Sequence, residues 1–114
     1  MCPKTHSECA KHLLPVRDAL DILGGKWKLP IIIALLYGNK RFKEMQREIP
    51  HITAKMLSKE LKDLEVNQLV TRTVYDSIPV TVEYSLTQYG KSLQSVLKEL
   101  GKWGTTHRKR IIAK

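Results

Sequence analysis

Apolar residues recur along the chain at two different spacings, which predict where helices and strands lie. From Val16 to Leu23 they fall three or four positions apart, on one side of a helix that Gly24-Gly25 ends. The run from Trp27 to Tyr37 is apolar almost all round, and periodicity alone does not separate a buried strand from a buried helix there. We favour a helix with Pro30 in its first turn, closed by Gly38-Asn39.

Two more helices follow, separated by Pro50. Phe42, Met45 and Ile49 share the spacing of a short helix that Pro50 ends. Thr53 is a favourable N-cap for the next one, which extends to about residue 66. Its apolar side consists of Leu57, Leu61 and Leu64, and its opposite side of Lys55, Ser58, Lys59 and Lys62. The helix at about 53–66 is therefore expected to bury its leucine side chains and expose its lysine side chains to solvent.

After Asn67 the spacing changes to two, which is typical of strands. Residues 69–75 are rich in β-branched side chains, and Val82, Tyr84 and Leu86 alternate with polar residues. The segment 76–80 between them is a hairpin tip. Thr87 can cap a final helix, whose apolar stripe is Tyr89, Leu93, Val96, Leu97, Leu100 and Trp103.

The order of helices, helix–turn–helix, β-hairpin and last helix is the winged-helix plan. The predicted fold class is α+β, mostly α: a winged helix–turn–helix with N- and C-terminal dimerisation helices. Residues 1–12 are polar and are expected to form a flexible arm, residues 13–106 the DNA-binding and dimerisation domain, and residues 107–114 a basic tail.

Composition narrows the function. The 114 residues suit one domain, and 20 Lys and Arg against 11 Asp and Glu give a net charge of +9, which favours a polyanionic partner. No apolar run is long enough to span a membrane, and we expect no membrane partner. The lack of a signal peptide and the two cysteines favour the cytoplasm. Because no phosphate loop, paired carboxylates or catalytic triad is visible, we expect neither an enzyme nor a cofactor.

The chain also resembles a known family, the HxlR-type winged-helix transcriptional regulators, which are relatives of the MarR group. The resemblance implies a homodimer that binds a pseudo-palindromic operator. The matching segments are 19–27, 41–45, 52–57, 61–65, 82–87 and 102–104.

Three positions depart from the family pattern. Leu14 stands before Pro15, where many members carry a sensing cysteine. Thr81 stands where the wing usually has an arginine that reaches the groove, and Pro30 replaces an aliphatic residue.

The start of the helix at about 53–66 has the groups that a major-groove helix needs. Short polar side chains near its N-terminus reach base edges. Thr53 and Ser58 can hydrogen-bond to bases, and the Ala54 methyl group can contact a thymine methyl group.

The lysines of the same helix extend this site. Lys55 and Lys59 are long enough for guanine O6 and N7, and Lys62 is better placed for a phosphate. The alternative is that the three lysines are only the solvated face of an amphipathic helix. The helix–turn–helix context and the net charge favour DNA contact.

Three more cations are candidates for the DNA backbone. Lys43 and Arg47 lie four positions apart on the preceding helix, although they are equally spaced for an exposed face beside Glu44 and Glu48. Arg72 on the wing, at about 69–86, is the nearest substitute for the missing arginine, and we include Thr81 with it. The alternative for Arg72, equally supported by the sequence, is a surface residue that faces Glu83 across the hairpin and makes no DNA contact.

The apolar stripes of the first and last helices are too long for one small body to cover. They either complete the core of the single chain or, as we expect, form an isologous dimer interface. The interface residues would be Val16, Leu20, Leu23, Leu93, Val96, Leu97, Leu100 and Trp103. Two recognition helices would then read half-sites about 10 bp apart, or a multiple of that.

Cys2, His6, Cys9 and His12 combine the two residue types that bind zinc. Four ligands along one straight helix cannot surround a tetrahedral ion, so a loose arm without metal is favoured. Thiol sensing by Cys9 and a dimer-bridging metal stay as alternatives.

The sequence therefore predicts a sequence-specific, dimeric regulator that binds double-stranded DNA. A non-specific nucleoid protein or an RNA-binding protein is the alternative. A small-molecule or electrophile effector is possible, and the sequence identifies none.

Overall fold

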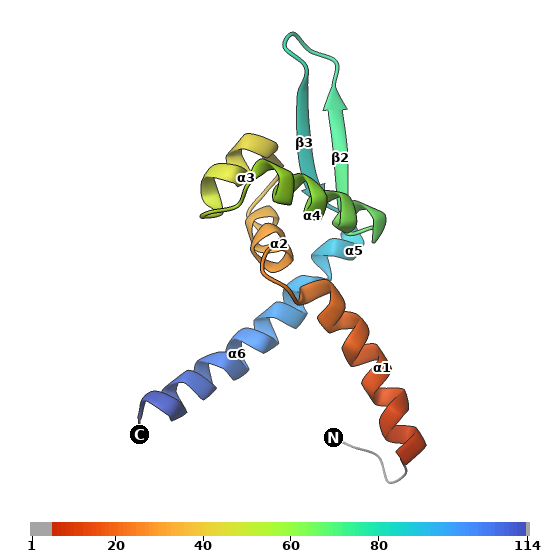
Figure 1. The fold of residues 1–114 in the computed structure, drawn as a ribbon, viewed down its shortest axis with the longest axis vertical. Coiled ribbons are helices and arrows are strands. Elements are labelled where there is room, and N and C mark those ends of the chain that lie inside the picture. Colours follow the sequence, from red (N-terminus) through yellow and green to blue (C-terminus); the bar gives the residue numbers. More distant parts are fainter. Residues whose placement is uncertain (1–5, 114) are drawn as a thin grey trace.

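The computed structural model describes the backbone of residues 6–113 and the side chains of residues 11–113. Its elements are α1 (His6–Leu23), α2 (Lys28–Leu36), β1 (Lys40–Arg41), α3 (Phe42–Glu48), α4 (Ala54–Val66), β2 (Val70–Tyr75), β3 (Thr81–Leu86), α5 (Gln88–Lys91) and α6 (Leu93–Ile112). Helices α3 and α4 form the helix–turn–helix, and β2 and β3 form the wing (Figure 1). The predicted α+β, mostly α winged helix–turn–helix is confirmed.

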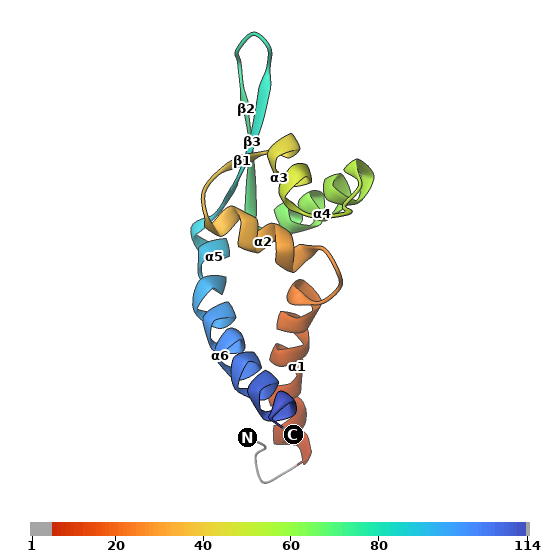
Figure 2. The ribbon, with the colours of Figure 1, turned by 90° about the vertical axis from the view of Figure 1, so that its left-hand side faces the viewer.

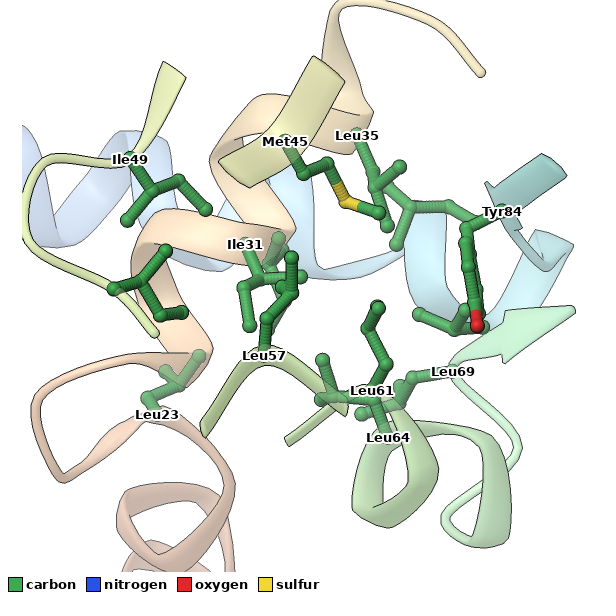
Figure 3. Packing of buried hydrophobic residues seen from close by; sticks show 14 residues of the cluster. Leu23, Ile31, Leu35, Met45, Ile49, Leu57, Leu61, Leu64, Leu69 and Tyr84 are labelled. Atoms are coloured by element: carbon green, nitrogen blue, oxygen red, sulfur yellow. The ribbon is translucent and has the colours of Figure 1, made fainter. Parts of the chain in front are cut away.

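The core lies where α2, α3 and α4 meet the base of the wing. Ile31 of α2, Met45 of α3 and Leu57 of α4 are fully buried. Figure 3 shows their side chains converging with those of Leu69, which directly precedes β2, and Tyr84 of β3. This core holds α4 by its leucine side and leaves the opposite side of the helix outward.

Local chemistry explains where the helices begin. Pro30 is the third residue of α2, and the first backbone hydrogen bond of the helix comes from the next residue, Ile31 N–H to Trp27 O at 3.2 Å. The missing N–H of proline therefore costs no helical bond. At α4, the Thr53 hydroxyl oxygen accepts the Met56 N–H at 3.1 Å, as predicted for an N-cap.

The sheet is antiparallel, in the order β1-β3-β2. Tyr84 and Leu86 are buried, which confirms the predicted alternation of β3. The alternative in which Arg72 faces Glu83 is off by one residue in register: Arg72 pairs with Tyr84, and Thr73 pairs with Glu83. In an antiparallel pair, opposite residues share a face. Arg72 therefore lies on the face that carries Tyr84 into the core.

The outer helices differ from the prediction at both ends of the chain. Helix α1 begins at His6, so residues 6–12 of the expected arm are helical, with Pro15 inside the helix. Helix α6 continues to Ile112 through most of the expected tail, where Lys109 and Arg110 suit the negative end of a helix.

The predicted final helix is two helices. Thr87 caps α5, because its hydroxyl oxygen accepts the Gly90 N–H at 2.9 Å. At Ser92 the backbone N–H bonds to Tyr89 O, three residues back, at 3.1 Å. This tighter turn ends α5 and separates it from α6.

Helices α1 and α6 project from the body on the side away from the wing (Figures 1 and 2). The radius of gyration is 17.3 Å, whereas a compact domain of this length has about 13 Å. The accessible surface is 9011 Å², against about 6,400 Å² for a compact monomer of this mass. The single chain therefore leaves much of its helical surface uncovered.

Candidate nucleic-acid interface

The outward side of α4 gathers the residues that the sequence singled out. Leu57, Leu61 and Leu64 are buried. The residues predicted to contact DNA on this helix and its cap are all exposed: Thr53, Ala54, Lys55, Ser58, Lys59 and Lys62. Among residues 11–113, the only hydrogen-bond partner of these side chains is the Met56 N–H, which donates to the Thr53 hydroxyl oxygen, so the hydroxyl hydrogen is available to an acceptor.

Among residues 11–113, some lysines form ion pairs and others do not. Lys28 lies 3.0 Å from Glu60 and 3.6 Å from Asp63, and Lys40 lies 3.0 Å from Glu48. Hydrogen bonding to Glu60 raises the pKa of Lys28 above its usual 10.5, against the opposing effect of burial. Within residues 11–113, no carboxylate lies within 4 Å of an α4 lysine nitrogen. The charge of that face is therefore available to a partner.

A second basic group lies between α3 and the wing, around a hollow of about 430 Å³. The hollow is lined by Arg41, Phe42, Lys43, Glu44, Arg47 and residues 80–82. Within residues 11–113, no carboxylate lies within 4 Å of a side-chain nitrogen of these cations: Glu44 accepts the backbone N–H of Arg41 at 2.7 Å, and Glu48 pairs with Lys40. Arg47 Nε donates to Lys43 O at 3.4 Å.

Arg41 was not among the predicted site residues. It reaches the hollow because the two-residue strand β1 pairs with β3 and places Arg41 opposite Glu83. A strand of two residues has no periodicity to detect in a sequence. The one signal in the sequence is its place at the start of the segment 41–45, which resembles the family.

Glu83 connects the wing to β1. Its carboxylate accepts the Tyr75 hydroxyl at 3.1 Å and the Asn39 side-chain amide at 3.3 Å. The hydrogen bond to Glu83, and then the charge of that carboxylate, raise the pKa of Tyr75. Thr81 is half-buried beside the hollow, and Arg72 is exposed on β2.

The residues predicted for the dimer interface divide into two groups. Leu23 is 8 % exposed and belongs to the core of the single chain, and Leu93 and Leu97 are half-buried against it. The others are exposed: Val16, Leu20, Val96, Leu100 and Trp103. Helix α6 buries none of its residues in the single chain.

The cysteine and histidine pattern is only partly visible. Cys2 lies outside the described residues, as do the side chains of His6 and Cys9, whereas His12 is exposed on α1. Among the described side chains, no three His, Cys, Asp or Glu gather as metal ligands. Residues 6–113 also contain no helix long and apolar enough to cross a membrane.

Comparison with known proteins identifies the family of this chain. The profile of the HxlR-like helix-turn-helix family matches residues 22–111. The chain belongs to this family. It is 41 % identical to the uncharacterised HTH-type transcriptional regulator YtcD of Bacillus subtilis over 104 residues, which cover 91 % of this chain and 82 % of YtcD.

Solved structures agree with the family assignment. The redox regulator HypR in its reduced form matches with a TM-score of 0.79 and 39 % identity, over 88 % of this chain and 99 % of HypR. The reduced form of YodB from B. subtilis matches with a TM-score of 0.72 and 43 % identity, over 90 % of each chain. This HxlR-family protein is thus a winged helix–turn–helix DNA-binding protein of transcription regulation, and these relatives are regulators rather than enzymes.

Proposed function

We propose that this HxlR-family protein is a homodimeric regulator that binds a pseudo-palindromic operator in double-stranded DNA. Helix α4 would lie in the major groove, with the wing on the neighbouring DNA. The observation that carries the proposal is the division of α4: its leucine side is buried, and the other side presents unpaired lysines beside short polar groups. A location in the cytoplasm follows from the proposed DNA partner.

On α4, each side chain has a role set by its position. Thr53, Ala54 and Ser58 would contact base edges close to the N-terminus, and Lys55 and Lys59 would reach guanine. Lys62 lies further along the helix and would meet a phosphate.

The cations around the hollow would hold the DNA backbone. Lys43 and Arg47 lie on α3, and Arg41 adds a third positive charge that faces the wing residues across the same hollow. Phosphate contacts set the register of a protein on DNA. Arg72 and Thr81 would add contacts from the wing.

The uncovered surface of α1 and α6 supports a dimer. The exposed apolar side chains of both helices would pack against a second copy, with the same surface used twice. Of the residues named for this interface, Val16, Leu20, Val96, Leu100 and Trp103 would contribute most, and Leu23, Leu93 and Leu97 would support them from the core. The two α4 helices would then address half-sites about 10 bp apart, or a multiple of that.

The proposal is tested by selecting duplexes from random sequence with the purified protein and measuring their binding by fluorescence anisotropy from 50 to 200 mM salt. We expect a palindromic duplex that binds at least about a thousandfold more tightly than random DNA. Equal affinity for all duplexes, falling steeply with salt, would support a non-specific nucleoid protein instead. Preference for single-stranded RNA would support the RNA-binding alternative.

A further inference from the structure

The tip of the wing is apolar. Ile78 is 102 % exposed, the highest value among the large apolar side chains of the described residues, and Val80 is 61 % exposed. The segment 76–80 contains no Lys or Arg, and its only charged residue is Asp76. A cation-based contact with DNA is therefore unavailable at the tip.

Two hydrogen bonds lie within this tip. The Ser77 N–H donates to Tyr75 O at 2.9 Å, and the Ser77 hydroxyl donates to Pro79 O at 2.8 Å. Lower in the wing, the Tyr75 hydroxyl donates to Glu83 across the ribbon. Ile78 is thus presented outward by a braced turn.

The wing is placed to bring Ile78 to DNA. Figure 1 shows the hairpin extending well beyond α3 and α4, from the part of the body that carries them. A six-residue strand spans about 20 Å, whereas the major groove is about 12 Å wide. With α4 in the major groove, the tip can therefore reach past one backbone into the adjacent minor groove.

We propose that Ile78, with Val80 beside it, enters the minor groove next to the α4 site and packs against sugars and base edges. This rests on the proposed function. Apolar side chains such as isoleucine and proline are used in this groove by other DNA-binding proteins. The basic hollow at the base of the wing, with Arg41, Lys43 and Arg47, favours DNA as the occupant, because phosphates flank both sides of a minor groove.

The proposed apolar contact should favour some base pairs over others. The guanine N2 amino group stands on the floor of the minor groove, and A·T pairs lack it. An apolar tip leaves that donor without an acceptor, so it favours A·T pairs. Inosine·cytosine pairs also lack the amino group while keeping the major-groove face of G·C, so they isolate the minor-groove contribution.

The test compares binding of the full chain to 30-bp duplexes of alternating I·C and alternating G·C pairs by fluorescence anisotropy. We expect the wild type to prefer I·C about fivefold to tenfold, and Ile78→Ser to lose that preference, in line with the burial of part of one isoleucine. Ile33→Ser, at an exposed isoleucine of α2 that lies outside both the proposed dimer helices and the candidate DNA-binding face, is the matched control and should keep the preference. An unchanged preference in Ile78→Ser, or none in the wild type, would overturn the proposal.

A salt series gives a second readout. Ile78→Ser should leave the slope of log K against log salt unchanged, whereas Ile78→Arg should steepen it by about 1, because it adds a phosphate-neutralising charge. A steeper or shallower slope in Ile78→Ser would contradict an apolar contact. Lys59→Ala separates the two proposals: if it binds the selected operator like the wild type, the proposed role of α4 fails, while the I·C preference still tests the wing.

Discussion

Lys28 Nζ lies 3.0 Å from Glu60 Oε1, and this ion pair ties the first residue of α2 to the middle of α4. The two side chains are only 17 % and 16 % exposed. The pair therefore holds α4, which carries the candidate DNA-binding face, against the start of α2. It acts beside the leucine contacts, which hold the same helix through the core.

Replacing Lys28 with methionine should therefore destabilise the protein. Lys28→Met keeps the length of the side chain and leaves the Glu60 carboxylate without its partner, at a cost of about 1–2 kcal/mol in the free energy of unfolding. Urea unfolding followed by circular dichroism measures the loss. Lys102→Met removes the exposed pair with Glu99 and should cost less than about 0.5 kcal/mol. Equal losses would mean that the Lys28 pair has no special role.

The same variant has a defined pH dependence. The pKa of Lys28 is raised in the folded state above its usual 10.5. The stabilisation by its charge is therefore complete below pH 10.5 and disappears as the pH rises through the folded-state pKa. The difference in unfolding free energy between wild type and Lys28→Met should be the same at pH 7 and pH 9, and smaller above pH 10.5.

Lys59 and Lys43 should differ in the kind of DNA binding that they support. Lys59→Ala should weaken binding to the selected operator more than binding to random DNA, by about 1–3 kcal/mol, because it removes a base contact. Lys43→Ala should weaken both about equally and reduce the salt slope by about 1. Anisotropy titrations at several salt concentrations measure both effects. An equal loss on both DNAs in Lys59→Ala would make Lys59 a phosphate contact instead.

Leu100 tests the dimer. Its side chain is 51 % exposed in the single chain, so Leu100→Glu should fold normally. In the proposed interface the new charge would be buried without a partner, and the apparent mass by light scattering should fall by half. Affinity for the palindromic operator should drop by about two orders of magnitude, since two half-sites would no longer be bound together. Ile78→Glu, at the exposed wing tip, is the control for mass and should stay dimeric.

The sequence predicts α4 well because its signals are local. A cap at Thr53, a leucine stripe and a lysine face all lie within one short segment, and each acts within a turn or two of the helix. The sequence does not reveal that Arg72 pairs with Tyr84 rather than Glu83, because hairpin register depends on the geometry of the loop at 76–80, where a slip of one residue changes every partner.

Arg41 shows a different limit of the sequence. Its place in the hollow depends on the pairing of β1 with β3, more than forty residues further along the chain, and two residues carry no pattern. The division between α5 and α6 was also invisible, because the apolar stripe continues across Ser92 without a change of spacing. Long-range pairing and small backbone turns therefore set the parts of the site that the pattern of residues did not reveal.

Gly90 is the glycine whose replacement should be most harmful. It is buried in α5, and a Cβ atom there would overlap the Leu69 carbonyl oxygen at the start of the wing and crowd the Leu86 side chain. The obstacle is mainly backbone, which cannot rotate away. Gly90→Ala should therefore destabilise the protein by about 2–3 kcal/mol, as overpacking of a core does. At Gly101 in α6, a Cβ atom would have open space on the outside of its helix, with no other heavy atom of the described residues within 4 Å. Gly101→Ala should instead stabilise by about 0.5–1 kcal/mol, since alanine favours the helix. The urea midpoints of both variants measure these changes in stability. A Gly90→Ala protein as stable as the wild type would show that α5 is free to move away from the wing.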